Sequence, residues 1–301
     1  MVRRVPLTIQ RRQNAQASKR DEVMKGTRLA LPAGVADRYA QRLQRLAAEM
    51  VAVTQREVER LFKHPDVQEH LAGFGADISP ASQARILTNK LSDRFEQLFT
   101  AAAKPTAEEM VNQADDASAA AVHQSLRKLS GGLSLKTFGI KTPAMEEFMK
   151  AMVANNVSLI KSIPSEFFRD VQQAVLSSIT DGKGLDDLTA FFENRAGVEH
   201  RRAKNIAIDQ THKAYNGLNK ERLQKNGVQA FEWVHSGGGI HPREHHIRRF
   251  PAGLNGGHFE FSKLPIIDER TGERGIPGQA INCRCTMVPI IKFEDGKPAN
   301  E

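Results

Sequence analysis

The feature that most constrains the fold is a run of helical stripes between residues 33 and 190. Apolar residues recur there at alternating spacings of four and three, which places them on one face of a helix. Aromatic residues are only 6% of the chain, which favours helices packed through Leu, Ala, Val and Met. The sequence therefore predicts a mainly helical body of packed antiparallel helices. The first stripe consists of Tyr39, Leu43, Leu46, Met50 and Val53.

Prolines indicate where individual helices begin and end. Thr142 and Pro143 have the order of a capping hydroxyl followed by proline at the first helical position. Pro105 is expected to end one helix, with Thr106 capping the next, and Pro164 is expected to open another. Between residues 33 and 190 no cluster of titratable side chains indicates catalysis.

The pattern changes after about residue 190. Residues 195–225 predict a long amphipathic helix with eight basic and three acidic residues. Its basic face is expected to be solvated, or else to contact nucleic acid or an acidic partner. A strand follows with the only tryptophan, Trp233, and the final strand carries Pro289, which favours an edge position. We therefore expect a basic, flexible arm at 1–31, a helical domain at 32–190 and an α+β domain at 191–301. The helix residues expected to contact DNA are Arg201, Arg202 and Lys204.

The first 28 residues carry eight Lys or Arg and two acids, a local charge of +6. Such an arm is either a solvated tail or a segment that binds nucleic acid by releasing counterions. No apolar run of about 18 residues predicts a membrane span, and no apolar stretch follows the basic start, so we expect a protein used in a cytoplasm. The arm residues expected to bind DNA are Arg3, Arg4, Arg11, Arg12, Lys19 and Arg20.

The only two cysteines, Cys283 and Cys285, are one residue apart. In an extended segment they would face one side with Cα atoms about 6.6 Å apart, which suits a shared ion and is the outer limit for a disulfide. We expect both to meet His246, with His235 as the fourth ligand of a tetrahedral zinc site. The single residue between the cysteines is fewer than the two to four usual in zinc fingers, and it favours a reduced, packed thiol pair over a metal site. Other histidines that could supply the fourth ligand are His241, His245 and His258.

Four segments in order resemble a known family: RAKNIAIDQTHKAYN, FEWVHSGGGIHPREHH, a Phe-X-Phe at 259 and INCRCTMVP. Over about the last third of the chain, this order resembles the phage Mu F-like head morphogenesis family, the minor head proteins of tailed bacteriophages. The matching positions are Arg202, Ala203, Thr211, Asn216, Trp233, Arg243, His246, Asn282, Cys283, Arg284, Cys285 and Pro289.

The resemblance implies a mainly helical N-terminal body followed by a small α+β Mu F-like domain. It implies a minor capsid protein that is not an enzyme, has no catalytic residues and acts in head assembly. Its expected partners are the portal protein, the major capsid or scaffolding protein and non-specifically bound phage DNA, with no membrane. Its expected location is inside the head near the portal, and the host cytoplasm during assembly. The alternative is a metal-dependent nuclease-like protein that uses the C-terminal His/Cys cluster, including Asn255 and His258.

Overall fold

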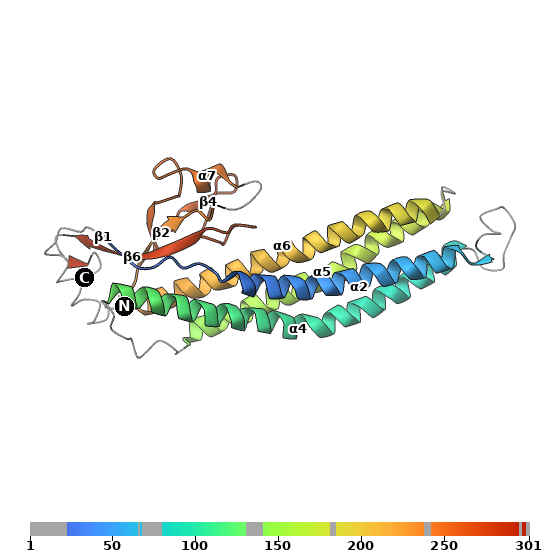
Figure 1. Cartoon of the computed structure of the whole chain (residues 1–301), viewed down its shortest axis with the longest axis horizontal. Helices are drawn as coiled ribbons and strands as arrows, with labels where there is room; N and C mark the ends of the chain where they lie inside the picture. The colour runs from blue at the N-terminus through green and yellow to red at the C-terminus, as the bar shows by residue number, and fades with distance from the viewer. Residues whose placement is uncertain are drawn as a thin grey trace. The chain divides into compact units, whose positions relative to one another are not determined.

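The computed structural model describes residues 23–65, 67, 80–130, 141–180, 185–237, 242–294 and 297–298. Its long helices are α2 (Ala33–Phe62), α4 (Pro80–Leu129), α5 (Pro143–Thr180) and α6 (Leu185–Lys225), and α7 (Glu244–Ile247) is a single turn (Figure 1). The strands are β1 (Val23–Lys25), β2 (Ala230–Val234), β3 (His258–Glu260), β4 (Ile266–Asp268), β5 (Glu273–Arg274), β6 (Thr286–Glu294) and β7 (Lys297–Pro298). The predicted fold class, a helical body followed by a small α+β domain, is confirmed.

Contacts within the chain define two units, and each unit combines segments that are distant in sequence. The first unit comprises residues 1–36, 110–152 and 208–301, and the second comprises residues 37–109 and 153–207. These units are groups of contacting residues and do not test which segment folds independently. The domain boundaries proposed from the sequence therefore remain predictions.

The second unit is a bundle made from segments of the four long helices. The Tyr39 hydroxyl donates to Asn156 Oδ1 at 2.9 Å and so links α2 to α5 inside the bundle. Phe95 of α4 stacks on Phe168 of α5, with ring centroids 6.0 Å apart. Between α5 and α6, Arg202 forms an ion pair with Glu166. The bundle thus combines an apolar interior with specific polar links between helices.

Pro105 and Pro164 lie inside α4 and α5, so the predicted helix breaks at both prolines are wrong. Phe99, Ala103 and Ala107 are buried at spacings of four residues, so the apolar stripe of α4 continues across Pro105. Burial of this continuous face outweighs the backbone hydrogen bond lost at the proline. In contrast, the predicted start of α5 is confirmed, because Met145 N–H donates to Thr142 Oγ1 at 3.2 Å.

The first unit contains an antiparallel sheet in the order β1-β6-β2-β3, with β7 also paired to β6. Strand β6 therefore lies between two strands, and the edge position predicted from Pro289 is wrong. Pro289 lies opposite Phe231 of β2, and on the β1 side its carbonyl accepts a hydrogen bond from Gly26 N–H at 2.8 Å. The carbonyl takes part in this pairing without requiring the N–H that proline lacks.

Strand β1 belongs to the part of the predicted arm that the structure describes. It pairs with β6 in the register Val23↔Lys292, Met24↔Ile291 and Lys25↔Ile290. Met24 is buried, and Leu29 is fully buried in the same core. Because basic residues dominate this stretch, its short apolar pattern was not recognised in the sequence. The buried apolar side chains attach the stretch to the sheet.

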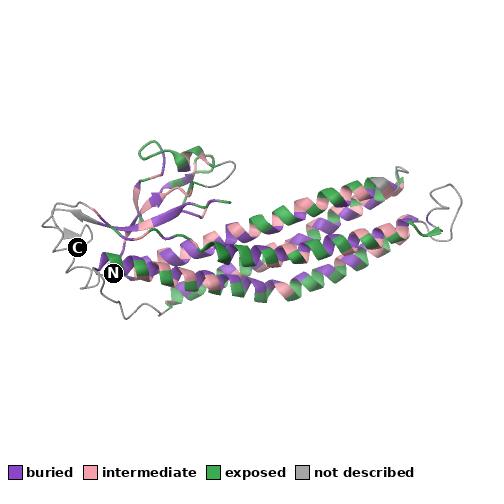
Figure 2. Ribbon diagram, viewed as in Figure 1, coloured by how far each residue is buried: buried purple, intermediate pink, exposed green. Residues whose placement is uncertain are grey.

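One apolar core joins the sheet to the helices of the first unit. Strands β2 and β6 are largely coloured as buried in Figure 2. Trp233 and Phe231 of β2 are fully buried, and Leu126 of α4 and Leu223 of α6 belong to the same cluster. This core also includes both cysteines, so it supports the backbone on which the candidate site is built. Among the described residues, no helix is sufficiently long and apolar to cross a membrane.

Candidate functional site

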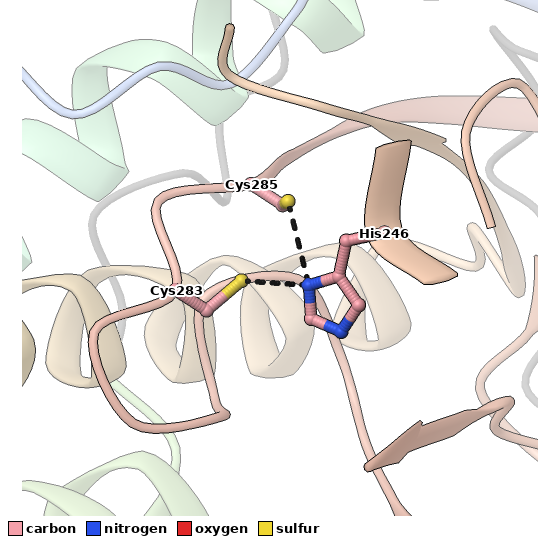
Figure 3. Close-up of side chains that lie close together, drawn as sticks. All are labelled: His246, Cys283 and Cys285. Atoms are coloured by element: carbon pink, nitrogen blue, oxygen red, sulfur yellow. Dashed lines mark hydrogen bonds between the residues drawn. The ribbon is translucent and has the colours of Figure 1, made fainter. Parts of the chain in front are cut away.

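The two cysteines and one histidine converge at the start of β6. His246, on α7, directs its Nδ1 atom toward both sulfurs, as Figure 3 shows. The Nδ1 atom lies 3.5 Å from Cys283 Sγ and 3.8 Å from Cys285 Sγ. The relative exposures of Cys283, Cys285 and His246 are 5%, 2% and 2%. The structure thus brings together the three residues expected to meet, although metal binding by them stays a prediction.

A backbone contact determines which nitrogen of the neutral His246 ring carries the proton. Its Nε2 lies 2.9 Å from the carbonyl oxygen of Ile267, a fully buried residue of β4. A carbonyl only accepts, so Nε2 carries the proton and Nδ1 presents a lone pair to the two sulfurs. The ring also packs edge-on against Trp233, with centroids 5.1 Å apart. His246 is therefore held in the tautomer that can bind an S–H proton or a metal ion.

The two thiols differ in acidity because they are hydrogen-bonded to each other. Their hydrogen bond lowers the pKa of Cys283 and raises the pKa of Cys285. Burial acts in the opposite direction on the pKa of Cys283. One thiolate shared by the pair is the expected result, and a thiolate is the form of cysteine that binds metals.

His235, which follows β2, is the nearest additional donor. Its Nδ1 atom lies 3.6 Å from Cys285 Sγ, but the close group in which all ligand atoms lie within 4.8 Å of one another comprises only His246, Cys283 and Cys285. A pocket of about 380 Å³ adjoins these residues, and Arg243 also lines it. The cluster therefore has an open side on which His235 lies.

The other histidines considered as ligands have different positions. His241 lies outside the described residues. His245 Nε2 lies 3.0 Å from the Ile266 carbonyl, and His258 Nε2 lies 3.5 Å from the Glu232 carboxylate. Asn255 accepts a hydrogen bond from the backbone N–H of His235. In the part of the chain that the structure describes, neither His245 nor His258 joins the Cys/His group.

Two side chains hold the turn that precedes Cys283. Asp209 of α6 accepts a hydrogen bond from the backbone N–H of Asn282 at 2.7 Å, and Arg243 donates to the Ile281 carbonyl at 3.1 Å. Asn282 has a φ of 57°, in the left-handed region that asparagine tolerates better than most residues. Asp209 was not predicted from the sequence. It could have been found as a single acidic residue beside the buried residues Ala207 and Gln210 on α6.

The other motif residues are mainly internal. Thr211 and Trp233 are fully buried, and Asn216 is 1% exposed, with its amide donating to the His212 carbonyl at 3.0 Å. Burial is the main cause that lowers the pKa of the His212 imidazole. Ala203 is buried and Arg284 is exposed. Most of the motif therefore supports the sheet and its turn from within.

The basic residues of α6 are used differently from the expectation. Arg202 bonds Glu166 and donates to Ser162 Oγ at 3.0 Å, whereas Arg201 and Lys204 are exposed. Ion pairs also engage the basic side chains of three further residues on this helix, Arg195, Lys213 and Arg222. The outer face is consequently less cationic than the sequence count indicates. The six basic arm residues expected to bind DNA, from Arg3 to Arg20, lie outside the described residues.

Together, the fold and the site define a mainly helical α+β protein with a buried Cys/His cluster at its terminal sheet. Residues 169–288 match the family described as "Phage Mu protein F like protein". This match takes in all of α6, the tryptophan strand and the cysteine turn, and it confirms the resemblance: over this stretch the chain is similar to the phage Mu F-like family. The family is associated with phage head morphogenesis.

A relative extends the similarity beyond that stretch. Over 256 residues the chain is 27% identical to an uncharacterized protein of Haemophilus influenzae. This aligned stretch covers 84% of this chain and 52% of the relative. The chain therefore spans about half the length of the curated relative it matches. No solved structure matches the chain.

Proposed function

We propose that the chain is a minor capsid protein of a tailed bacteriophage that acts in head assembly near the portal and contacts packaged DNA. The observation that carries this proposal is the family match over residues 169–288. Partners at the portal are the portal protein itself and the major capsid or scaffolding protein. The protein would be made in the host cytoplasm and incorporated inside the head.

The burial of the motif favours a structural role over catalysis. Thr211, Trp233 and Asn216 face the interior, where a substrate has no access to them. Cys283, Cys285 and His246 are also buried and join a turn to α7, and their cluster adjoins a pocket on the side where His235 lies. A catalytic site generally presents its reacting groups in an accessible pocket. In this proposal the motif gives the terminal sheet a rigid shape for contact with other head proteins.

Contact with DNA would depend mainly on the N-terminal arm. The local charge of +6 on residues 1–28 is the strongest concentration of positive charge in the sequence. On α6, Arg201 and Lys204 are the exposed members of the predicted set, since Arg202 is engaged by Glu166. Each phosphate neutralised by a basic side chain releases counterions, so binding should be salt-sensitive and independent of DNA sequence.

The DNA contact can be tested by measuring affinity for duplex DNA at several salt concentrations. Changing the six basic residues of the arm to Gln should lower the slope of log K against log salt by up to about 5, at about 0.9 for each lost contact. A smaller reduction is expected for Arg201→Gln with Lys204→Gln. A matched control removes the exposed pair Arg85 and Lys90 of α4. Equal slopes in all variants would contradict DNA binding by the arm.

The role at the portal can be tested by co-expressing the full chain with the portal protein of the same phage. Sedimentation should recover the chain in the fractions that contain portal rings. The same experiment with capsid and scaffolding proteins should place the chain in assembled head precursors. If the chain stays at its monomer position in both mixtures, the proposed partners are wrong.

The nuclease-like alternative requires an accessible group of metal ligands that includes Asn255 or His258. Instead, Asn255 caps the backbone of His235, and His258 contacts Glu232. These contacts favour structural roles for both residues. Incubation of the purified chain with supercoiled DNA and Mg²⁺, Mn²⁺ or Zn²⁺ tests the alternative directly, and cleavage that Cys283→Ser abolishes would support it.

A further inference from the structure

The positions of the sulfur and nitrogen atoms fit those around a tetrahedral zinc ion. Zinc bonds of about 2.3 Å to sulfur and about 2.0–2.1 Å to nitrogen, at a tetrahedral angle, place S and N about 3.5 Å apart. In this chain His246 Nδ1 lies 3.5 Å and 3.8 Å from the two sulfurs, and His235 Nδ1 lies 3.6 Å from Cys285 Sγ. The two distances from His246 therefore agree with a tetrahedral site shared with both cysteines, and His235 approaches this group through Cys285.

The His246 lone pair has two sulfur neighbours, and this favours a metal over hydrogen bonds alone. The Nδ1 atom of a neutral imidazole accepts one proton along one direction, so only one of the two thiols can donate to it well. A metal ion placed among the donors would use both sulfurs and the nitrogen at the same time. The Nε2–H···O=C bond to Ile267 is the kind of contact that orients a metal-binding histidine.

We propose that Cys283, Cys285, His246 and His235 bind one Zn²⁺ ion as a structural site. The ion would join three segments that are separate in sequence: the end of β2, helix α7 and the turn before β6. Helix α7 has only four residues and the turn contains the left-handed Asn282. Neither segment has an extended hydrogen-bond ladder, so a link through zinc would supply much of their order.

The charges around the cluster are compatible with this ion. Two cysteine thiolates balance the charge of Zn²⁺, and histidines bind as neutral rings. Arg243 and Arg284, both positively charged, line the adjoining pocket. With His235 closing the fourth position, no site remains for a reactive water. The proposed zinc is thus structural and independent of the role at the portal.

The test measures zinc in the full chain, purified from zinc-supplemented medium without chelators. One zinc per chain is expected, and cobalt substitution should give thiolate-to-cobalt charge transfer and the strong visible bands of tetrahedral coordination. X-ray absorption should show sulfur at about 2.3 Å and nitrogen at about 2.0–2.1 Å. Cys283→Ser, Cys285→Ser, His246→Gln and His235→Gln should each weaken zinc binding more than about tenfold. His245→Gln, a neighbour outside the cluster, is the matched control.

Several outcomes would overturn the proposal. One is a wild-type chain that binds zinc no more tightly than the double variant Cys283→Ser/Cys285→Ser. Another is cobalt binding without a thiolate charge-transfer band. The cobalt spectrum can be measured on the native chain even if the variants fail to fold. Unchanged affinity in His235→Gln would overturn the four-ligand arrangement. A chelator should lower the melting temperature of the wild type but leave that of the double variant unchanged.

Discussion

The carboxylate of Asp209 on α6 accepts a hydrogen bond from the backbone N–H of Asn282, 73 positions later, at 2.7 Å. Lys213 and Gln210 contact the same carboxylate at 2.8 Å and 3.0 Å. One acid therefore positions the strained turn that leads into Cys283. This relationship connects the helix segment of the family motif to its cysteine segment.

Removing that acid should destabilise the first unit. Asp209→Ala is expected to lower the free energy of unfolding by about 1.5–3 kcal/mol, because a charge-assisted hydrogen bond to the turn before Cys283 is lost. Asp209→Asn keeps an acceptor oxygen and should cost less. Urea unfolding, monitored by circular dichroism, measures the free energy of unfolding of both variants. Asp116→Ala, on the exposed face of α4, is the control. An equal effect at Asp116 would show that the turn is not held this way.

Arg222 of α6 forms a buried ion pair with Asp115 of α4. Arg222 Nη2 lies 2.5 Å from Asp115 Oδ1, and the side chains are 7% and 5% exposed. Arg222→Met should cost about 3–5 kcal/mol, because Asp115 would remain buried with its charge. The loss of stability should lie toward the lower end of this range, since Lys141 still contacts Asp115.

The exposed pair of Arg42 and Glu109 provides the comparison, with side chains 42% and 50% exposed. Arg42→Met should change the free energy of unfolding by less than about 1 kcal/mol. The same denaturation experiment measures both variants. Similar small losses at Arg42 and Arg222 would be inconsistent with a buried, energetically important pair.

Gly278 lies against the motif residue Asn216. It has a φ of 81°, and an added Cβ would meet Asn216 Nδ2 at 2.3 Å. Gly272 has a φ of 72° with no heavy atom within 4 Å of such a Cβ, so it isolates the backbone effect. Gly272→Ala should cost about 1–2 kcal/mol, and Gly278→Ala should cost about 1–3 kcal/mol more. Equal losses would mean that Asn216 moves aside freely.

Glu199 gives a pH dependence to the second unit. Burial is the largest effect on this carboxyl and raises its pKa in the folded chain, although Arg195 acts in the opposite direction. A raised pKa means that the folded state binds the proton more tightly than the unfolded state. Stability from this group is therefore present below the unfolded pKa of about 4.3 and decreases as pH rises through the folded value.

Replacement by glutamine removes this titration. The stability of Glu199→Gln relative to the wild type should increase as pH rises from about 4 through the folded pKa. Thermal unfolding of both proteins across this range measures the difference. A relative stability that stays constant or decreases with pH would contradict a raised pKa for Glu199.

The sequence predicts those features that depend on local patterns. Alternating spacings of four and three identify the helical stripes, and Thr142-Pro143 marks the start of α5. The meeting of Cys283 with His246 could also be anticipated, because paired cysteines close to several histidines are a recognisable pattern. These predictions need only residue types and their spacing.

Features that depend on tertiary packing could not be predicted in this way. Pro105 remains inside α4 because the apolar face is buried on both sides of it, and β6 is central because Gly26 donates to the Pro289 carbonyl. The pairing of Arg202 with Glu166, 36 positions away, also lowers the free positive charge of α6. In each case the deciding partner is distant in sequence.

Quantitative mass spectrometry of purified phage heads, with copy number counted against the major capsid protein, tests directly whether this chain is a head protein. A minor head protein should be present in heads at a small number of copies, far below the major capsid protein. It should also stay with the heads after washing at a salt concentration that removes adsorbed proteins. Absence of the chain from purified heads and from their assembly precursors would contradict a role in head assembly.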